Sequence, residues 1–148
     1  MPDGNRNSLT DLLVRIPLFD SLVPDECRRV LASCKQVSFS KDDVIFEVGD
    51  PGTRLIILLQ GSVSVQSANG HEIGRLEPID TIGEMEIAST QPRHARAVAL
   101  TDMSGMMILQ NDLESLFERY PELGVKLLRN IVNSLAEKLV ANIKLQDV

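Results

Sequence analysis

Hydrophobic residues at helical spacing open the chain and predict a short amphipathic helix that ends near Pro17. The apolar positions of this helix are Leu12, Leu13, Ile16 and Leu18. Pro24 predicts the start of a second helix, because proline suits the first helical position and the acidic Asp25 and Glu26 then lie in the first turn. The apolar face of the second helix comprises Cys27, Val30, Leu31 and Cys34.

Between Gln36 and Gln110 the spacing changes to the two-residue alternation and the short β-branched runs that are typical of strands. The clearest runs are Val44–Phe46, Leu55–Leu59, Ala95–Leu100 and Met103–Leu109. Asn69-Gly70 joins two further runs and predicts a hairpin with a type I′ turn, which needs positive φ at both central residues. About eight short strands at regular spacing indicate a sandwich or barrel, such as a double-stranded roll.

Helical spacing returns after the strands. Asn111 or Asp112 is expected to cap one helix, and Pro121 is expected to start a long final helix. The apolar stripe of the final helix consists of Leu128, Ile131, Val132, Leu135, Leu139 and Ile143. Part of this stripe alternates steps of four and three residues, as in a coiled-coil seam. Asn142 in such a seam is compatible with a dimer, because a buried polar residue can fix the register.

Composition narrows the classes of function. The chain has 148 residues, 43% of them hydrophobic, which suits one domain with a substantial core. Its 21 acidic residues against 15 Lys and Arg give a net charge of −6, which argues against a nucleic-acid-binding surface. The longest apolar run is far shorter than a membrane span, and the polar N-terminal residues do not form a signal peptide. Cys27 and Cys34 are too far apart in a helix to bridge each other, which indicates a cytoplasmic protein with reduced thiols.

One segment, residues 82–97, offers binding chemistry. It interrupts the strands with an expected helical turn at 84–89 and a loop. Gly83 permits close backbone approach, and the free N–H groups at a helix start favour an anion. The guanidinium fork of Arg93 matches a phosphate, and the Glu84 carboxylate can accept a hydrogen bond from a sugar hydroxyl. One phosphate-binding arginine, without lysine or metal ligands, suits a singly charged phosphodiester better than a triphosphate.

From about Leu12 to Leu145 the chain carries the sequence features of a known family. They are the stretches LVRIPLFDSL, VIFEVGDPGTRLIILLQGSVSV, IGEMEIASTQPRHARAVAL and LESLFERYPELGVKLLRNIVNSLAEKL. In these stretches the chain resembles the cyclic nucleotide-binding domain of catabolite-activator-like regulators, of the regulatory subunits of cyclic-AMP-dependent kinase and of nucleotide-gated channels. The resemblance implies a mainly β fold with flanking helices, a double-stranded β-helix (jelly-roll, cupin-like) with N-terminal helices and a long C-terminal helix.

The resemblance also implies an organisation and a set of site residues. Residues 1–148 would form one domain, with N-terminal helices at 7–35, a β-roll at 36–110 that contains the phosphate-binding cassette 82–97, and C-terminal helices at 111–146. Glu84 would hold the ribose 2′-hydroxyl and Arg93 the cyclic phosphate. The backbone of Glu86 and Ile87 would line the turn, and Ala95 would approach the phosphate. The other implied binding residues are Gly83, Met85 and His94, and the implied structural turn glycines are Gly49 and Gly61.

Three positions depart from the family pattern. Glu86 stands where a small residue is usual, and a second carboxylate beside an anionic ligand is unfavourable unless it points outward or pairs, for instance with Arg96. We expect Glu86 to be a solvated helix residue. His94 replaces the common Ser, Thr or Ala, and the missing hydroxyl favours cyclic AMP over cyclic GMP. Ile79 replaces a glycine just upstream of the cassette.

The leading hypothesis is a cytoplasmic sensor of cyclic AMP or cyclic GMP. It would bind no metal, nucleic acid or membrane, would not be an enzyme, and would signal through residues 111–146 to a homodimer partner or an unknown effector protein. Since transcription regulators of this type continue into a helix-turn-helix, the chain length predicts a sensor without a DNA-binding domain. A ligand-free protein-interaction module on the same fold is the alternative, in which the roll is a scaffold and the acidic surface and the terminal helix bind a protein; Glu86, Ile79 and His94 favour it. Without a ligand site, Glu84 and Arg93 would form a surface ion pair of little energetic weight. A cupin-like metalloenzyme is disfavoured, because His71 and His94 alone cannot build a His-rich metal site.

Overall fold

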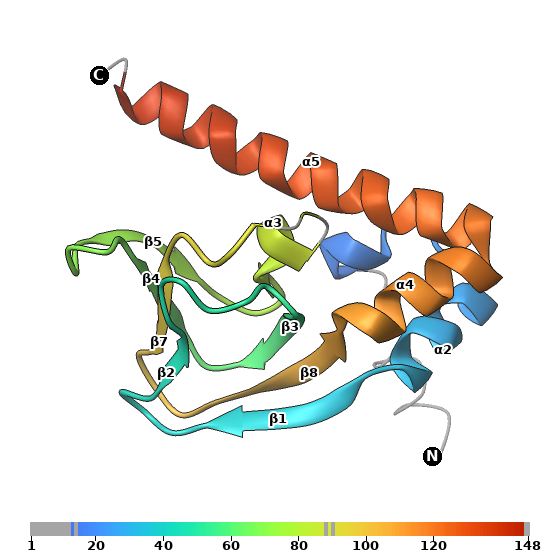
Figure 1. Cartoon of the computed structure of the whole chain (residues 1–148), viewed down its shortest axis with the longest axis horizontal. Coiled ribbons are helices and arrows are strands. Elements are labelled where there is room, and N and C mark those ends of the chain that lie inside the picture. Colours follow the sequence, from blue (N-terminus) through green and yellow to red (C-terminus); the bar gives the residue numbers. More distant parts are fainter. Residues whose placement is uncertain (1–12, 14, 88, 90, 147–148) are drawn as a thin grey trace.

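The structure, a computed structural model, describes residues 13, 15–87, 89 and 91–146, with side chains as far as residue 141 (Figure 1). A 3₁₀ helix, η1 (Pro17–Phe19), and α2 (Pro24–Ala32) precede the strands. The strands are β1 (Lys35–Phe39), β2 (Val44–Phe46), β3 (Arg54–Gln60), β4 (Val63–Gln66), β5 (Glu72–Leu76), β6 (Thr81–Ile82), β7 (Arg96–Ala99) and β8 (Met103–Leu109). The remaining helices are α3 (Glu84–Ile87), α4 (Gln110–Arg119) and α5 (Pro121–Gln146).

The eight strands form two antiparallel sheets of four strands each, in the orders β1-β8-β3-β6 and β2-β7-β4-β5. The predicted double-stranded roll with flanking helices is therefore confirmed, as is the number of strands. In Figure 1 the roll lies at the lower left, and α2 and α4 lie at the right-hand end of the molecule. The helix α5 runs along the whole upper edge and passes over α3.

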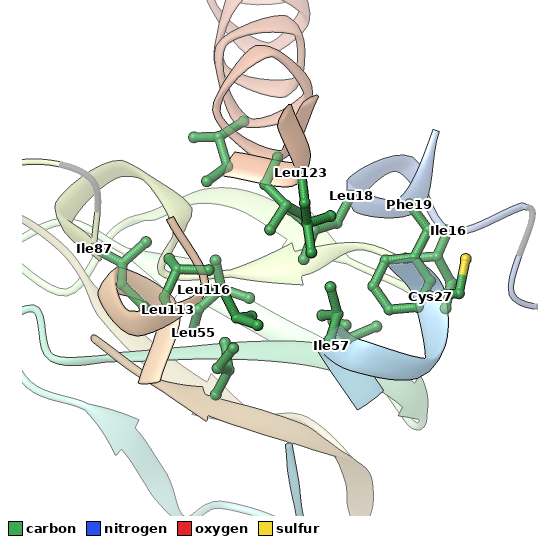
Figure 2. Close-up of a cluster of buried hydrophobic side chains, with 14 residues drawn as sticks. Ile16, Leu18, Phe19, Cys27, Leu55, Ile57, Ile87, Leu113, Leu116 and Leu123 are labelled. Carbon is green, nitrogen blue, oxygen red and sulfur yellow. The ribbon is translucent and has the colours of Figure 1, made fainter. Parts of the chain in front are cut away.

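The continuous apolar run of β3 is explained by burial on both of its faces. Leu55 and Ile57 belong to a core between the sheet and the helices, whereas Ile56 and Leu58 belong to a second core inside the roll. Alternate residues of a strand point to opposite faces, so a strand that lies between two cores has no polar face. The helix-side core joins β3 to side chains of η1, α2, α3, α4 and α5, as Figure 2 shows.

Two predicted local features differ from the structure. The helix α4 begins at Gln110 after the extended Leu109, without a side-chain cap from Asn111 or Asp112, because the backbone N–H of Gln110 donates to the Thr53 carbonyl at 2.8 Å. The hairpin at Asn69-Gly70 is present, but only Gly70 takes a positive φ, of 85°. The N–H of Gly70 donates to the Ser67 carbonyl, so the turn has the geometry of a type I turn followed by a left-handed glycine.

Other local predictions at the N-terminal end and at the glycines are confirmed. Leu13 and Arg15 are helical and Pro17 begins η1, whereas Leu12 lies outside the described residues. Pro24 occupies the start of α2. Gly49 and Gly61 both take a positive φ, of 90° and 93°, as structural turn glycines do.

The N-terminal half of α5 packs on the core, and the following residues are mostly exposed as far as residue 141, where the described side chains end. Leu123, Leu127 and Ile131 are buried, and the side-chain amide of Asn130 donates to the carbonyls of Leu18 and Asp20 at 2.8 Å each. Of the predicted stripe, Ile131 is buried and Leu135 is half-buried, while Leu128, Val132 and Leu139 are exposed. The side chains of Asn142 and Ile143 lie outside the described part of the structure. No helix in the described ranges combines the length and the apolarity that crossing a membrane requires.

Candidate cyclic nucleotide site

The cassette begins where the short strand β6 ends against β3. Gly83 follows β6 with φ +87°, a left-handed conformation that glycine adopts without strain. The turn leads into α3, which carries Glu84, Met85 and Glu86, and the chain returns through Arg93 into β7. The backbone of Arg93 is fixed by two hydrogen bonds, since its N–H donates to the Asp50 carbonyl at 2.8 Å and its carbonyl accepts from the Gly49 N–H at 2.9 Å.

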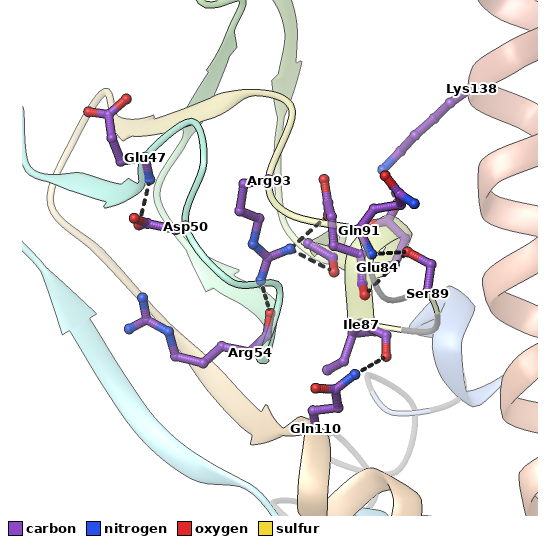
Figure 3. A network of polar contacts seen from close by, with 12 residues as sticks. Glu47, Asp50, Arg54, Glu84, Ile87, Ser89, Gln91, Arg93, Gln110 and Lys138 are labelled. Carbon is purple, nitrogen blue, oxygen red and sulfur yellow. Dashed lines mark hydrogen bonds and ion pairs between the residues drawn. The ribbon is translucent and has the colours of Figure 1, made fainter.

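The guanidinium of Arg93 is buried beneath this turn, with 3% of the residue exposed (Figure 3). Its Nη1 donates to the Gly83 carbonyl at 3.0 Å and to Glu86 Oε2 at 2.8 Å, and its Nη2 donates to the Arg54 carbonyl. The guanidinium carbon lies 3.9 Å from the ring centroid of Phe46, a cation–π contact. Burial lowers the pKa of Arg93, and the hydrogen bond with Glu86 opposes that shift. The arginine stays charged at any physiological pH.

Glu86 corrects the prediction of a solvated residue, because it is 7% exposed and forms a buried ion pair with Arg93. The suggested partner Arg96 pairs instead with Glu47, at 2.8 Å. Space beside Gly52 explains the inward position of Glu86. A Cβ at residue 52 would lie 2.3 Å from the Cβ of Glu86, so only a glycine lets the two backbones approach this closely.

One of the three donor nitrogens of the arginine has no partner. Within the described part of the chain, the buried Nε of Arg93 has no hydrogen-bond acceptor. An unsatisfied donor on a buried guanidinium is costly, so a ligand oxygen that reached it would gain binding free energy.

Glu84 lies in the same cassette but faces a different neighbour. It is 4% exposed, pairs with Lys138 of α5 and accepts a hydrogen bond from the Ser134 hydroxyl at 3.3 Å. The surface ion pair between Glu84 and Arg93 that is expected for a chain without a ligand site is not formed, because the two residues belong to separate pairs, Glu84–Lys138 and Glu86–Arg93. Sequence reasoning did not identify Lys138 or Ser134, because nothing local in α5 indicates that it crosses the cassette.

The remaining predicted site residues lie on the outside of the cassette. Met85 and His94 are exposed, and Ala95 is half-buried. A pocket of about 410 Å³ adjoins the cassette loop. It is lined by Gly49, Pro51, Gly52, Thr53, Ser89, Gln91, Pro92 and Gln110. Arg93, Glu84 and Glu86 do not line this pocket; all three are buried, and each is paired with another side chain.

The two cysteines are not paired with each other and do not belong to a metal site in the described ranges. Cys27 and Cys34 are free thiols, and burial raises the pKa of Cys34 to about 11. Among the described residues, no three His, Cys, Asp or Glu side chains gather where they could hold a metal ion.

Comparison with known proteins identifies relatives that are similar to this chain in sequence. The chain is 31% identical over 113 residues to a cyclic nucleotide-gated potassium channel of Mesorhizobium japonicum, across 76% of this chain and 31% of that protein. It is 26% identical to a CRP-like cAMP-activated global transcriptional regulator of Mycobacterium tuberculosis, across 86% of this chain and 58% of that protein. It also matches 22% of the length of a Bradyrhizobium diazoefficiens protein named glutaminase 1, at 29% identity. The chain spans less than two thirds of each of these relatives.

Solved structures and the family model agree on the fold. A cyclic nucleotide-binding domain from Methylobacillus flagellatus is similar with a TM-score of 0.80 and 25% identity, covering 88% of this chain and 76% of that one. The model of the cyclic nucleotide-binding domain matches residues 36–120, which include the strands β2 to β8 from end to end and the whole cassette. The chain therefore belongs to the cyclic nucleotide-binding domain family.

Proposed function

We propose that this protein senses a cyclic nucleotide, with cyclic AMP preferred to cyclic GMP, through the cassette 82–97. The observation that carries the proposal is the buried Arg93, whose Nε–H lacks an acceptor among the described residues. In a bound state Arg93 would hold the cyclic phosphate and Glu84 the ribose 2′-hydroxyl. Gly83, the backbone of Glu86 and Ala95 would surround the phosphate. Met85 and His94, both exposed, would lie at the edge of the site.

The contact between Glu84 and α5 suggests how binding would be transmitted. A ribose hydroxyl that bonded to Glu84 would compete with Lys138 and Ser134, which now hold that carboxylate. Loss of these contacts would favour another position of α5, so the nucleotide would bind the two positions with different affinity. Such a difference in affinity is what a sensor requires.

A second copy of the chain is the partner that we propose for α5. The exposed apolar residues Val125, Leu128, Val132 and Leu139 are separated by three, four and seven residues. This spacing places them along one side of a helix, as in a coiled-coil seam. An effector protein on the same face remains the other output of the sensor. The two free thiols agree with a reducing compartment such as the cytoplasm.

Thermal unfolding with cyclic AMP, cyclic GMP, cyclic di-GMP and plain AMP tests the proposal. A ligand at about 100 times its Kd adds about 2.7 kcal/mol to the free energy of unfolding. At this chain length each kcal/mol raises the melting temperature by about 2–4 °C. We expect a rise of several degrees with cyclic AMP, and its loss in Arg93→Ala and in the less disruptive Arg93→Lys. Arg75→Ala, at an exposed arginine of β5, is the matched control and should keep the full shift.

The same experiment decides between the sensor and a ligand-free interaction module. The module is favoured by the internal pairing of both Arg93 and Glu84. If none of the four nucleotides at millimolar concentration raises the melting temperature of the wild-type protein or of its Glu86 variants described below, the sensor proposal is wrong and the module replaces it.

A further inference from the structure

We infer that the Glu86 carboxylate is an internal anionic ligand of Arg93, which occupies the place of the nucleotide phosphate and sets the affinity and charge selectivity of the site. This inference rests on the proposed function. It assigns to Glu86 an active role in binding by exchange, in which the phosphate enters only as the carboxylate leaves.

The contacts of Arg93 support this assignment. Its guanidinium has three acceptors, which are the carbonyls of Gly83 and Arg54 and the carboxylate of Glu86. Glu86 is the charged one, at 2.8 Å, and the side chains of the pair are 2% and 9% exposed. A carboxylate on a buried guanidinium provides the oxygen geometry and the single negative charge that a phosphodiester would provide.

Burial makes the exchange obligatory. If Glu86 turned outward without a replacement, Arg93 would remain as an uncompensated charge beneath Gly83 and over Phe46, which is strongly unfavourable. If Glu86 stayed in place while a phosphate entered, two anions would share one cation. The stable arrangements therefore contain one anion on Arg93, either the carboxylate or the ligand.

One-for-one exchange has a consequence for the class of ligand. A phosphodiester with one negative charge replaces one carboxylate and leaves the charge on Arg93 balanced. A phosphomonoester such as AMP carries close to two negative charges at neutral pH and would add an excess charge to an enclosed site. The displaced carboxylate would remain on α3 beside the site, where it repels the nearly two charges of AMP more than the single charge of cyclic AMP. Glu86 should thus weaken the binding of every anion and should weaken AMP more than cyclic AMP.

Glu86→Gln tests the inference, because it keeps the size and an acceptor oxygen while it removes the competing charge. We expect the Kd for cyclic AMP, measured by calorimetry, to fall at least about tenfold, the change that one weakened competing contact produces. The ratio of the Kd values for AMP and cyclic AMP should fall as well. Glu118→Gln, at an exposed position of α4, is the matched control and should leave both values unchanged.

A readout without nucleotide separates this inference from the proposed function. Inorganic phosphate should raise the melting temperature of Glu86→Gln by several degrees and leave the wild type unchanged, because only the variant has a buried arginine without an anion. If Glu86→Gln does not fold, Glu86→Asp is the second variant, because the shorter side chain weakens the contact with Arg93. It should show the same changes in Kd and in melting temperature, but smaller ones.

The outcomes are distinct. Equal affinity of wild type and both variants for cyclic AMP overturns the inference and leaves the sensor intact. Stabilisation of the variants by phosphate, with no response to any nucleotide, overturns the sensor and supports Glu86 as the anion of Arg93. No response of any variant to phosphate or nucleotide overturns both.

Discussion

At the residue scale, Gly83 shows how closely the cassette backbone fits Arg93. Its φ is +87°, and a Cβ at this position would lie 2.4 Å from Nη1 of the arginine. Gly49 has a similar φ of +90°, but a Cβ there would meet no other atom within 4 Å. An alanine at Gly49 would therefore cost stability through backbone strain alone. Comparing alanine substitutions at the two glycines therefore separates the cost of backbone strain from the cost of a steric clash with Arg93.

We expect Gly83→Ala to lower the free energy of unfolding by about 3 kcal/mol or more and to weaken nucleotide binding. Gly49→Ala should cost about 1–2 kcal/mol, the strain of a left-handed non-glycine residue alone. Urea unfolding measures both values, and Gly74→Ala, with open space and an ordinary φ, is the control. If Gly83→Ala and Gly49→Ala lowered the free energy of unfolding equally, the contact between residue 83 and Arg93 would be unimportant for stability.

The residues of the site differ in how far they could be predicted. Gly83 and Arg93 lie in contact, as their local spacing in the chain indicates, and the binding roles of Gly83, Glu84 and Arg93 stay a prediction. The inward position of Glu86 could not be predicted, since it depends on Gly52, which lies far away in sequence and provides the room. The partners of Glu84 on α5 were missed for the same reason, because they are contacts between distant elements.

At the scale of elements, α2 and α5 are joined by an ion pair between Glu26 and Lys126 at 2.7 Å. Glu26 also accepts from the Val23 N–H at 3.0 Å and so caps its own helix. The hydrogen bond from Lys126 is the main reason that the pKa of Glu26 lies below its usual value, with the Val23 N–H as the second cause. A carboxyl whose pKa is lowered by folding stabilises the protein above its unfolded pKa and loses that contribution as the pH falls.

We expect Glu26→Gln to lower the free energy of unfolding by about 1 kcal/mol at pH 7, since the amide keeps the cap and loses the charge. The difference from wild type should shrink as the pH falls below the usual pKa of a glutamate, and it should vanish only once the pH lies below the lowered pKa of Glu26 in the folded state. Urea unfolding of both proteins at a series of pH values measures this difference in the free energy of unfolding. Glu118→Gln should differ from wild type by less than about 0.5 kcal/mol at every pH. A difference that is constant with pH would contradict the role of the ion pair.

The elements themselves were largely predictable from periodicity. Burial on two faces gives β3 an unbroken apolar run, and the absence of breakers after Gly124 agrees with a helix that continues to Gln146. The start of α4 was not predictable, because the Thr53 carbonyl, a tertiary partner, satisfies the N–H group that a side-chain cap would otherwise serve. The two halves of α5 also differ in burial although their apolar spacing is similar: Leu123, Leu127 and Ile131 of the first half are buried in the core, whereas Leu135 is only half-buried against it and Leu139 is exposed.

At the scale of the whole molecule, the exposed face of α5 predicts self-association. We expect Val132→Glu and Leu139→Glu to convert a dimer into a monomer at micromolar concentration, measured by light scattering, because each places a charge in the proposed seam. Asn133→Glu adds the same charge at the neighbouring exposed position and should leave the dimer intact. A wild-type protein that is monomeric at high micromolar concentration would exclude this arrangement and leave the face to another protein.

The way α5 is held gives it a mechanical property. It is anchored near its middle by Asn130 and Ile131, tied farther along by Lys138, and extends beyond α3 as Figure 1 shows. With a rise of 1.5 Å per residue, its end at Gln146 lies about 24 Å from Asn130. A rotation of about 10° around that fulcrum would move the tip by about 4 Å. In the proposed mechanism α5 would pivot about this anchor. Beyond Leu135, the contact described for its side chains is the ion pair of Lys138 with Glu84, so exchanging that partner for a ribose hydroxyl would free the far end of the helix to move by a distance that another protein can detect.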